Sequence, residues 1–261
     1  MKVLKDKVFV ITGCNGFLGS YFCEKIIDFG GFVFGLDLDV KSCEITSTSF
    51  KFVEVDITNP PSVCGAQKII SVVSDRVDVV INNAAINDSV EGEKLNLEKS
   101  KFENFPIELW EKSLKVNLTG PFLICQTFLD LLKNSTAPSI INVSSTYGLV
   151  APDQSIYRDS EGNQFFYKGP AYPTTKGGLI MFTKFLASYL GPQGIRVNAL
   201  CPGGVENGQE EQFIKNYSSK TCLGRMAKPE DYIGALEFLS SGKSSYMTGS
   251  VLCVDGGWTA Q

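Results

Sequence analysis

The sequence predicts an α/β fold in which a doubly wound, mostly parallel seven-stranded sheet carries helices on both of its faces. Two observations predict it: short β-branched segments alternate with longer helical patterns, and the strand segments are apolar almost throughout. A strand with an unbroken apolar run is buried on both faces, so a helical layer must cover each side of the sheet. The chain has 261 residues, 43% of them hydrophobic, and we expect a single domain over 1–261.

Four strands and two helices are expected in the first half of the chain. Segments rich in β-branched and aromatic residues predict the strands KVFVITG (7–13), FVFGLDLD (32–39), FKFVEVDIT (50–58) and VDVVINNAA (77–85). The first helix covers about 18–29, where apolar residues recur at helical spacing until Gly30 and Gly31 end the pattern. The second helix lies in the segment PPSVCGAQKIISVVSD, after its prolines.

Three strands and three helices are expected in the second half. The strands are SIINVSS (139–145), IRVNALCPGG (195–204) and SVLCVDGG (250–257), and the helices cover about 106–133, 171–190 and 229–240. Two further segments, 86–105 and 149–170, are expected to be loops, and each of them follows a strand. Ligands of such sheets bind beyond the carboxyl ends of the strands, so both loops are candidates to face a substrate. The alternative is that they are ordinary surface loops.

The composition argues against several functional classes. The formal net charge is −4 without a long basic run, and no apolar run approaches the roughly 18 residues of a membrane span, so we expect neither a nucleic-acid nor a membrane partner. The 8 cysteines are widely spaced without a CxxC pair, which favours reduced core thiols in a cytoplasmic protein over disulfides. The chain has 0 histidines, which removes the commonest transition-metal ligand and the usual base of a catalytic serine. We expect no metal site.

Three glycines mark the connection between the first strand and the first helix. In VFVITGCNGFLGS, Gly13, Gly16 and Gly19 allow a sharp turn that brings backbone N–H groups close to a bound pyrophosphate. The partial positive charge at the start of the helix favours the same anion. A tight turn without a ligand is the alternative, but the strand–turn–helix context favours a dinucleotide.

An acidic residue ends the second strand. Asp37 lies 18 residues after Gly19, where a carboxylate accepts hydrogen bonds from the adenosine ribose and repels the 2′-phosphate of NADP. Its neighbours Leu36 and Leu38 offer no positive charge to a phosphate, so NAD is favoured over NADP. Asp56, after the third strand, is expected either to turn the chain or to face the adenine amino group.

The stretch AYPTTKGG places Tyr172 four residues before Lys176, about one turn apart on a helix. The reference pKa of tyrosine, about 10, is too high for a base near neutral pH, and a neighbouring ammonium lowers it by stabilising tyrosinate. Such a pair would let a chain without histidine perform acid–base chemistry. The alternative is a helix tyrosine packed in the core, which the spacing by itself does not exclude.

Seven motifs, in order, resemble those of the short-chain dehydrogenase/reductase family over nearly the whole chain. They are TGCNGFLG, DI (56–57), NNAA (82–85), NVSS (142–145), YPTTK (172–176), RVNALCPGGV (196–205) and VDGG (254–257). The resemblance implies a single-domain Rossmann fold, a nicotinamide cofactor, and a homotetramer or homodimer. It also implies an oxidoreductase that interconverts an alcohol and a ketone.

The resemblance further implies roles for individual residues. Tyr172 would be the acid/base with Lys176 as its partner, Ser145 would donate to the substrate oxygen, and Asn117, in KVNLTG, would support a proton relay. Ser145 is preferred to Ser144 because STYG matches the family's Ser-x-x-Gly pattern. The residues that would bind the cofactor are Gly13, Asn15, Gly16, Phe17, Leu18, Gly19, Asp37, Asp56, Ile57, Asn83, Ala84, Ala85, Tyr172, Lys176, Pro202, Gly203 and Val205.

Three features depart from the family pattern. The glycine turn reads TGxxGxxG, as in the sugar-nucleotide-modifying branch, whereas the chain length and the CPGGV and VDGG segments are those of classical members. Asn207 stands where many members have threonine. From Ser145 to Tyr172 is 27 residues, about twice the usual gap, so 149–170 carries an insert. We expect this insert to wall a polar substrate, with a solvated or subunit-contact loop as the alternative.

The motifs around the insert also resemble those of members from bacterial surface-sugar and flagellar-glycan pathways, which implies a small, carbohydrate-like substrate. The leading hypothesis is therefore an NAD-dependent oxidoreductase that acts on a secondary alcohol or ketone of a sugar derivative. Two alternatives stay open. One is a sugar-nucleotide epimerase or dehydratase that retains its NAD, which the glycine turn favours. The other is a non-catalytic dinucleotide-binding protein.

Overall fold

The computed structural model describes residues 3–87, 89–90 and 93–261. Seven strands form one sheet in the order β3-β2-β1-β4-β7-β8-β9, and every pairing in it is parallel. The expected strands are confirmed, in a sheet that is wholly rather than mostly parallel. They are β1 (Val8–Thr12), β2 (Phe32–Asp37), β3 (Phe50–Glu54), β4 (Val79–Asn82), β7 (Ser139–Val143), β8 (Arg196–Pro202) and β9 (Val251–Val254).

The direction of chain progression across the sheet reverses between β1 and β4. From β1 the chain adds β2 and β3 on one side, and it then returns to place β4 on the other side of β1. Doubly wound sheets bind ligands in the crevice beyond the carboxyl ends of the strands at this reversal. Asn83, just after β4, joins the two strand ends because its amide Nδ2 donates to the carbonyl oxygens of Thr12 (3.1 Å) and Gly13 (3.2 Å).

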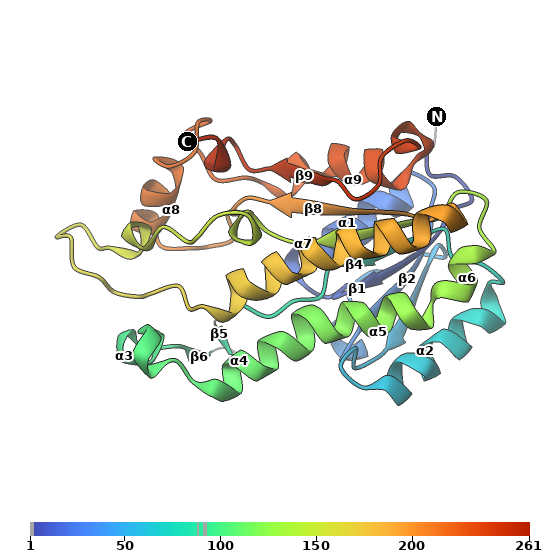
Figure 1. Ribbon diagram of the computed structural model, residues 1–261, viewed down its shortest axis with the longest axis horizontal. Coiled ribbons are helices and arrows are strands. Elements are labelled where there is room, and N and C mark those ends of the chain that lie inside the picture. Colours follow the sequence, from blue (N-terminus) through green and yellow to red (C-terminus); the bar gives the residue numbers. More distant parts are fainter. Residues whose placement is uncertain (1–2, 88, 91–92) are drawn as a thin grey trace.

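Helices cover both faces of the sheet, with α2, α5 and α7 in front of it and α1 and α9 behind it (Figure 1). Successive residues of β1 explain the two layers: Val10 packs in a core cluster with Ile124 of α5, whereas Phe9 packs with Phe22 of α1. Both faces of the strand are thus buried, as its unbroken apolar run predicts. The bounds are α1 (Phe17–Asp28), α2 (Pro60–Val73), α4 (Ile107–Leu114), α5 (Gly120–Thr127), α6 (Leu129–Lys133), α7 (Ala171–Leu190) and α9 (Ile233–Ser240).

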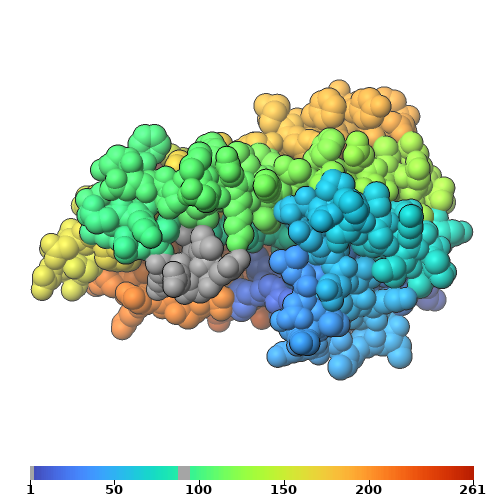
Figure 2. Space-filling model, turned by 90° about the horizontal axis from the view of Figure 1, so that it is seen from below, coloured from blue at the N-terminus to red at the C-terminus, as the bar shows by residue number. Residues whose placement is uncertain are grey.

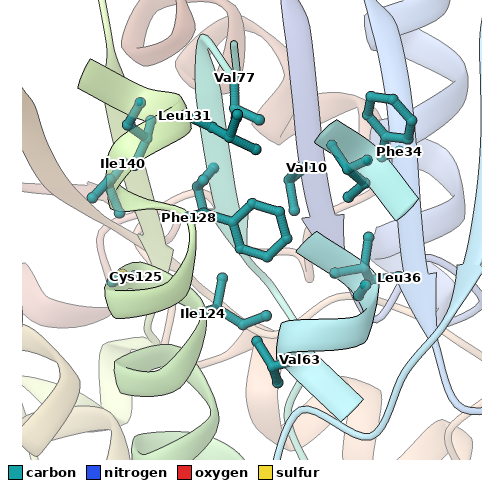
Figure 3. Packing of buried hydrophobic residues seen from close by; sticks show 14 of the residues in the cluster. Val10, Phe34, Leu36, Val63, Val77, Ile124, Cys125, Phe128, Leu131 and Ile140 are labelled. Atoms are coloured by element: carbon teal, nitrogen blue, oxygen red, sulfur yellow. The ribbon is translucent and has the colours of Figure 1, made fainter. Parts of the chain in front are cut away.

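The front core lies between the sheet and α2, α5 and α6. Figure 3 shows Val10, Phe34 and Leu36 of the strands facing Ile124 and Phe128 of the helical layer. All five side chains are fully buried. Burial of a side chain of this size stabilises the fold by about 1.5–3 kcal/mol, so this cluster fixes how the helices sit on the sheet.

The helix expected over 106–133 is not one continuous α-helix. A π-helical turn (Lys115–Thr119) separates α4 from α5, and Phe128 separates α5 from α6. A π turn adds a residue to one turn of the helix and is often found at functional sites. Here it carries the buried Asn117. Apolar spacing did not reveal this break because the pattern continues through it.

Some elements were not expected, and some expected strands run too far. The new elements are a hairpin of β5 (Ser89–Val90) and β6 (Glu93–Lys94) within the expected loop 86–105, α3 (Leu97–Ser100) and α8 (Glu211–Ser218). Such short segments carry too few residues to show a period. The strands expected over 50–58 and 77–85 end at Glu54 and Asn82, because the chain there leaves the sheet to line the crevice.

The insert 149–170 extends to one end of the molecule (Figure 1). It contains a 3-10 turn (Gln154–Tyr157) and a single bridge between Arg158 and Gln164. Seen from below, its tip projects beyond the segment around residue 100 at the same end of the molecule (Figure 2). Part of the insert and residues 100–103 together line a hollow of about 470 Å³.

All 8 cysteines are free thiols, which confirms that none forms a disulfide. The expectation of core positions is right for one group and wrong for another. Cys14, Cys23, Cys125 and Cys201 are buried, whereas Cys64, Cys222 and Cys253 are exposed. Over the described ranges, no helix is both long and apolar enough to cross a membrane.

Candidate active site

The glycine turn forms a cradle at the start of α1. Gly13 adopts a left-handed backbone with φ +70°, and a Cβ atom on Gly19 would lie 1.9 Å from the carbonyl oxygen of Gly13. Gly16 is the N-cap residue of α1 and makes no side-chain hydrogen bond, so the cap leaves the first backbone N–H groups of the helix available to a ligand. These N–H groups and the helix dipole fit a pyrophosphate, which the chain can therefore hold at this turn.

A groove of about 850 Å³ runs from this turn across the carboxyl ends of β1, β2, β3 and β4. Twelve residues expected to bind the cofactor line it: Gly13, Asn15, Gly16, Phe17, Leu18, Gly19, Asp37, Asp56, Ile57, Asn83, Ala84 and Ala85. The structure thus brings together residues spread over more than 70 positions of the sequence. Thr12 holds the groove-lining segment after β4 in place, because its Oγ1 accepts hydrogen bonds from the backbone N–H groups of Asn83 (3.1 Å) and Ala84 (3.0 Å).

Two carboxylates line the groove where β2 and β3 end. Asp37 accepts hydrogen bonds from the backbone N–H groups of Asn15 (2.9 Å) and Leu38 (2.8 Å), which hold its side chain at the end of β2. Asp56 Oδ1 accepts from Thr58 N (2.8 Å) and Thr58 Oγ1 (2.7 Å), so it turns the chain as well as lining the groove. The basic group among the described lining residues is Lys112, which comes from α4 and not from the β2 side.

A second cavity, of about 310 Å³, adjoins the groove and is lined by three of the four residues expected to be catalytic. Ser145, Tyr172 and Lys176 all line it, as do the expected cofactor contacts Pro202, Gly203 and Val205. The two cavities share Leu18, Asn83, Ala85 and Asn87 as lining residues. A cofactor that extended from the groove would therefore meet a molecule held beside Tyr172.

Lys176 is buried on the first half of α7. Its Nζ donates to the carbonyl oxygen of Val143 (2.7 Å) and lies 5.5 Å from the centroid of the Tyr172 ring. Desolvation lowers the pKa of Lys176 to about 8, so near neutral pH it is still largely an ammonium. The 3-10 turn after Ser145 (Thr146–Gly148) packs closely on this helix. Glycine at 148 permits this contact, because a Cβ there would clash with the Lys176 carbonyl group at 2.8 Å.

Neighbouring serines have different partners. Ser144 Oγ donates to the Lys176 carbonyl oxygen (2.8 Å) and so ties β7 to α7. Ser145 is 8% exposed, and its Oγ accepts a hydrogen bond from Tyr147 N (3.2 Å), which leaves its own hydroxyl proton for another acceptor.

Asn117 lies behind the cavity and does not line it. Its Oδ1 accepts from Ile86 N (2.9 Å), and its Nδ2 donates to Ile86 O (3.0 Å) and to Thr175 Oγ1 (3.0 Å). Thr175 Oγ1 in turn donates to the carbonyl oxygen of Tyr172 (2.8 Å). Asn117 therefore connects the chain after β4 to the first turn of α7.

Sequence reasoning missed several residues of the cavity wall. Lys168, Asn87, Gln209, Phe213 and Tyr217 line it, and three of these come from the segment around α8 that was not expected. The sequence around α8 shows no clear apolar periodicity, because polar residues surround Phe213 and Tyr217. Asn207, which stands where many members of the family have threonine, is exposed and is absent from the described cavity linings.

Aromatic rings form one side of the cavity. Tyr157 of the insert contacts Phe213 (ring centroids 5.5 Å apart), and Tyr217 stacks on Trp258 (4.4 Å). Burial raises the pKa values of Tyr147 and Tyr217, so both stay neutral phenols. In the described part of the chain, no cluster of three or more Cys, Asp or Glu side chains is placed to bind a metal ion.

Comparisons with known proteins agree with these features. Residues 33–259 match the family described as Enoyl-(Acyl carrier protein) reductase. The chain is 31% identical over 266 residues to the 3-oxoacyl-[acyl-carrier-protein] reductase FabG of Aquifex aeolicus, which covers 97% of this chain and 98% of that protein. It is 30% identical over 268 residues to the "Probable galactose dehydrogenase GalD" of Rhizobium meliloti. This match covers 97% of this chain and 95% of that protein.

The solved structures agree as well. A short chain dehydrogenase from Leptospira borgpetersenii with bound NAD+ has a TM-score of 0.86 and 35% sequence identity, over 98% of this chain and 93% of that one. The matches to these three proteins extend over nearly their full lengths. The family model begins at residue 33, after β1 and the glycine turn, and includes the segment with Tyr172 and Lys176. The chain belongs to the short-chain dehydrogenase/reductase family.

Proposed function

We propose that this protein is an NAD(H)-dependent oxidoreductase that interconverts a secondary alcohol and a ketone on a sugar or sugar derivative. Family membership makes it an NAD(P)-dependent oxidoreductase that acts on CH–OH groups. The cofactor preference, the substrate class and the residue roles are the proposal. The observation that carries it is the cavity that Ser145, Tyr172 and Lys176 share beside the dinucleotide groove.

The proton chemistry belongs to Tyr172. In the oxidation direction its phenolate accepts the proton of the substrate hydroxyl. Lys176, whose Nζ lies 5.5 Å from the centroid of the Tyr172 ring, stabilises that phenolate. Ser145 Oγ donates a hydrogen bond to the same substrate oxygen and holds it in place. When bound, the nicotinamide accepts the hydride in this direction and supplies it in the other.

Asn117 has a positioning role in this proposal. Its amide is engaged by the Ile86 backbone and Thr175, so it holds the chain that lies between the cofactor groove and α7. Loss of this amide would leave the part-buried N–H and C=O groups of Ile86 without this partner and so loosen this segment.

Asp37 supports NAD over NADP. Its carboxylate is fixed at the end of β2 by two backbone N–H groups, where the ribose hydroxyls of the adenosine would lie. A 2′-phosphate at this place would meet a fixed negative charge. The NAD+ in the Leptospira relative is consistent with this preference.

The cavity supports a small polyhydroxylated substrate. Its volume of about 310 Å³ lies at the lower end of ligand pockets, which span roughly 300–1,000 Å³. Its wall combines aromatic faces, such as those of Tyr157 and Phe213, with hydrogen-bonding groups, such as that of Gln209. Aromatic faces pack on the C–H faces of a sugar ring while polar groups bind its hydroxyls. The relative named "Probable galactose dehydrogenase GalD" supports the same substrate class.

A homo-oligomer and a cytoplasmic location are further parts of the proposal. Met181, Phe185 and Tyr189 lie four residues apart on α7 and are each about 60% exposed, and Phe122 of α5 is 46% exposed. A stripe of apolar residues of this kind suits contact with a second copy of the chain. The free thiols suit a reducing compartment.

The test is a cofactor and substrate screen. The purified protein is given NAD or NADP with monosaccharides, polyols, simple secondary alcohols or 3-oxoacyl thioesters, and the reduced cofactor is followed by absorbance. We expect turnover with NAD and a monosaccharide-sized alcohol. In Tyr172→Phe we expect kcat to fall by about 10²–10⁴-fold while NAD affinity is kept.

The other outcomes identify the alternatives. Turnover confined to acyl thioesters or simple alcohols would overturn the sugar assignment. An isomerised or dehydrated sugar nucleotide without net NADH would indicate the epimerase or dehydratase, which the TGxxGxxG turn favours. NAD binding without hydride transfer to any substrate would indicate a non-catalytic binding protein.

A further inference from the structure

A second lysine is buried in the active-site cavity. Lys168, in the insert 149–170, is 9% exposed, and its Nζ lies 4.6 Å from the centroid of the Tyr172 ring. The corresponding distance for Lys176 is 5.5 Å, so the insert provides the nearer of the two ammonium groups. Lys168 Nζ also donates to Oδ1 of Asn87, which lies where the groove and the cavity meet.

The insert holds the backbone of Lys168 at two points. Gln154 Oε1 accepts a hydrogen bond from Lys168 N (2.8 Å), and Gln154 Nε2 donates to Lys168 O (3.0 Å). Gln164 fixes this clamp, because its Nε2 donates to the carbonyl oxygens of Gln154 (2.7 Å) and Phe166 (2.7 Å). Gly169 packs so closely on Phe105 that a Cβ there would lie 2.2 Å from the ring.

The insert is also tied to the rest of the fold. Asn216 of α8 donates to the carbonyl oxygens of Ile156 (3.0 Å) and Arg158 (2.8 Å). Asp153 pairs with Lys220 (2.8 Å), whose hydrogen bond lowers the pKa of Asp153 to about 2. The position of Lys168 therefore comes from a folded segment and not from a solvated loop.

The charges around Tyr172 distinguish it from the other phenols of the cavity. Among the described lining residues, the titratable groups are Tyr147 and Tyr157 from the turns after β7, Tyr217 from α8, Lys168 from the insert, and Tyr172 and Lys176 from α7. None of these described groups is a carboxylate. Burial raises the pKa values of Tyr147 and Tyr217, whereas two ammonium groups lie 4.6 Å and 5.5 Å from the centroid of the Tyr172 ring.

We propose that Lys168 acts through Tyr172 as a second cation that stabilises the tyrosinate and so sets the pH range of the reaction. An ammonium near an acid favours its charged form. Two ammonium groups, 4.6 Å and 5.5 Å from the Tyr172 ring centroid, favour it more than Lys176 does on its own. The proton passes from the substrate hydroxyl to the phenolate oxygen as before, and Lys168 itself transfers none. The insert then belongs to the acid–base machinery and is not only a wall. This inference rests on the proposed function.

The test is the pH profile of alcohol oxidation in Lys168→Met. Loss of the ammonium should move the acidic limb of kcat/KM to higher pH by on the order of one unit. At a fixed pH below the limb, kcat/KM should then be roughly tenfold lower than in wild type. Lys168→Arg keeps a cation, so its acidic limb should lie close to the wild-type pH. The matched control is Lys220→Met, which removes a lysine that anchors the insert but has no contact with the Tyr172 ring, and its limb should stay at the wild-type pH.

A second measurement does not depend on turnover. Tyrosinate absorbance is titrated in the NAD-bound protein, and the Tyr172 contribution is taken as the difference from the same protein with Tyr172→Phe. We expect this phenol to titrate at higher pH in Lys168→Met than in wild type. If Lys168→Met does not fold, Gln154→Leu, which releases the backbone clamp, should give a smaller shift in the same direction.

The outcomes separate this inference from the proposed function. An unshifted limb in Lys168→Met, with Tyr172→Phe inactive, overturns the role of Lys168 and leaves the proposed function intact. A higher KM with an unshifted limb also overturns it and assigns Lys168 to substrate binding. An equal shift in Lys220→Met overturns it too, because the effect would then come from the fold of the insert. Retained turnover in Tyr172→Phe would defeat the proposed function itself.

Discussion

Gly19→Ala tests whether the phosphate turn needs glycine for close packing of its own backbone. The added Cβ would lie 1.9 Å from the Gly13 carbonyl oxygen, 2.8 Å from the Gly13 carbonyl carbon and 2.9 Å from Asn83 Nδ2. Real Cβ atoms essentially never lie nearer than 3.0 Å to such atoms, so α1 and the turn must separate by about 1 Å. Overpacking of this kind costs about 1–3 kcal/mol, and the better helix propensity of alanine offsets roughly 1 kcal/mol.

We therefore expect Gly19→Ala to lower the free energy of unfolding by up to about 2 kcal/mol and to weaken NAD binding at least tenfold. Binding suffers because the displaced N–H groups at the start of α1 no longer converge on the pyrophosphate. Denaturant unfolding and titration calorimetry with NAD measure the two effects.

The matched control is Gly65→Ala, in the middle of α2. Nothing lies within 4 Å of a Cβ added there, so alanine should stabilise the protein by about 0.5–1 kcal/mol without affecting NAD affinity. If Gly19→Ala is as stable as Gly65→Ala and binds NAD as the wild type does, the reasoning from close backbone approach is refuted.

Three further predictions concern cofactor choice, pH and assembly. Asp37→Ala should lower the NAD/NADP ratio of kcat/KM at least tenfold because the fixed carboxylate no longer repels a 2′-phosphate; an unchanged ratio contradicts this. Burial lowers the pKa of Lys176 from 10.5 to about 8, so between these pH values the unfolded chain holds a proton that the folded protein has released. The unfolding free energy of wild type relative to Lys176→Met should therefore rise through this interval by up to roughly 3 kcal/mol and be flat below it, as pH-dependent denaturation would show. Phe185→Glu should yield a smaller species than wild type in sedimentation, whereas the neighbouring control Lys184→Glu should not; equal masses would argue against α7 as a subunit contact.

Much of the fold was predictable because its signals are local. Each strand of the sheet is a short apolar run, and each major helix shows its own period, so neighbouring residues suffice to identify both. The phosphate turn is equally local, since Gly13, Gly16 and Gly19 act within one strand–turn–helix unit. Tyr172 and Lys176 lie one helical turn apart, so their spacing in the sequence was enough to predict the pair.

The sequence by itself determined the strands, the glycine cradle and the Tyr172–Lys176 pair, because each is set by residues a few positions apart. Only the tertiary structure decided which distant groups surround that pair. Lys168 reaches the Tyr172 ring because Gln154 clamps its backbone, and Phe213 enters the cavity because α8 packs on the insert. Asn117 faces Thr175 through a π turn that apolar spacing does not show. Such placements depend on how whole elements pack, and no periodicity within a segment encodes them.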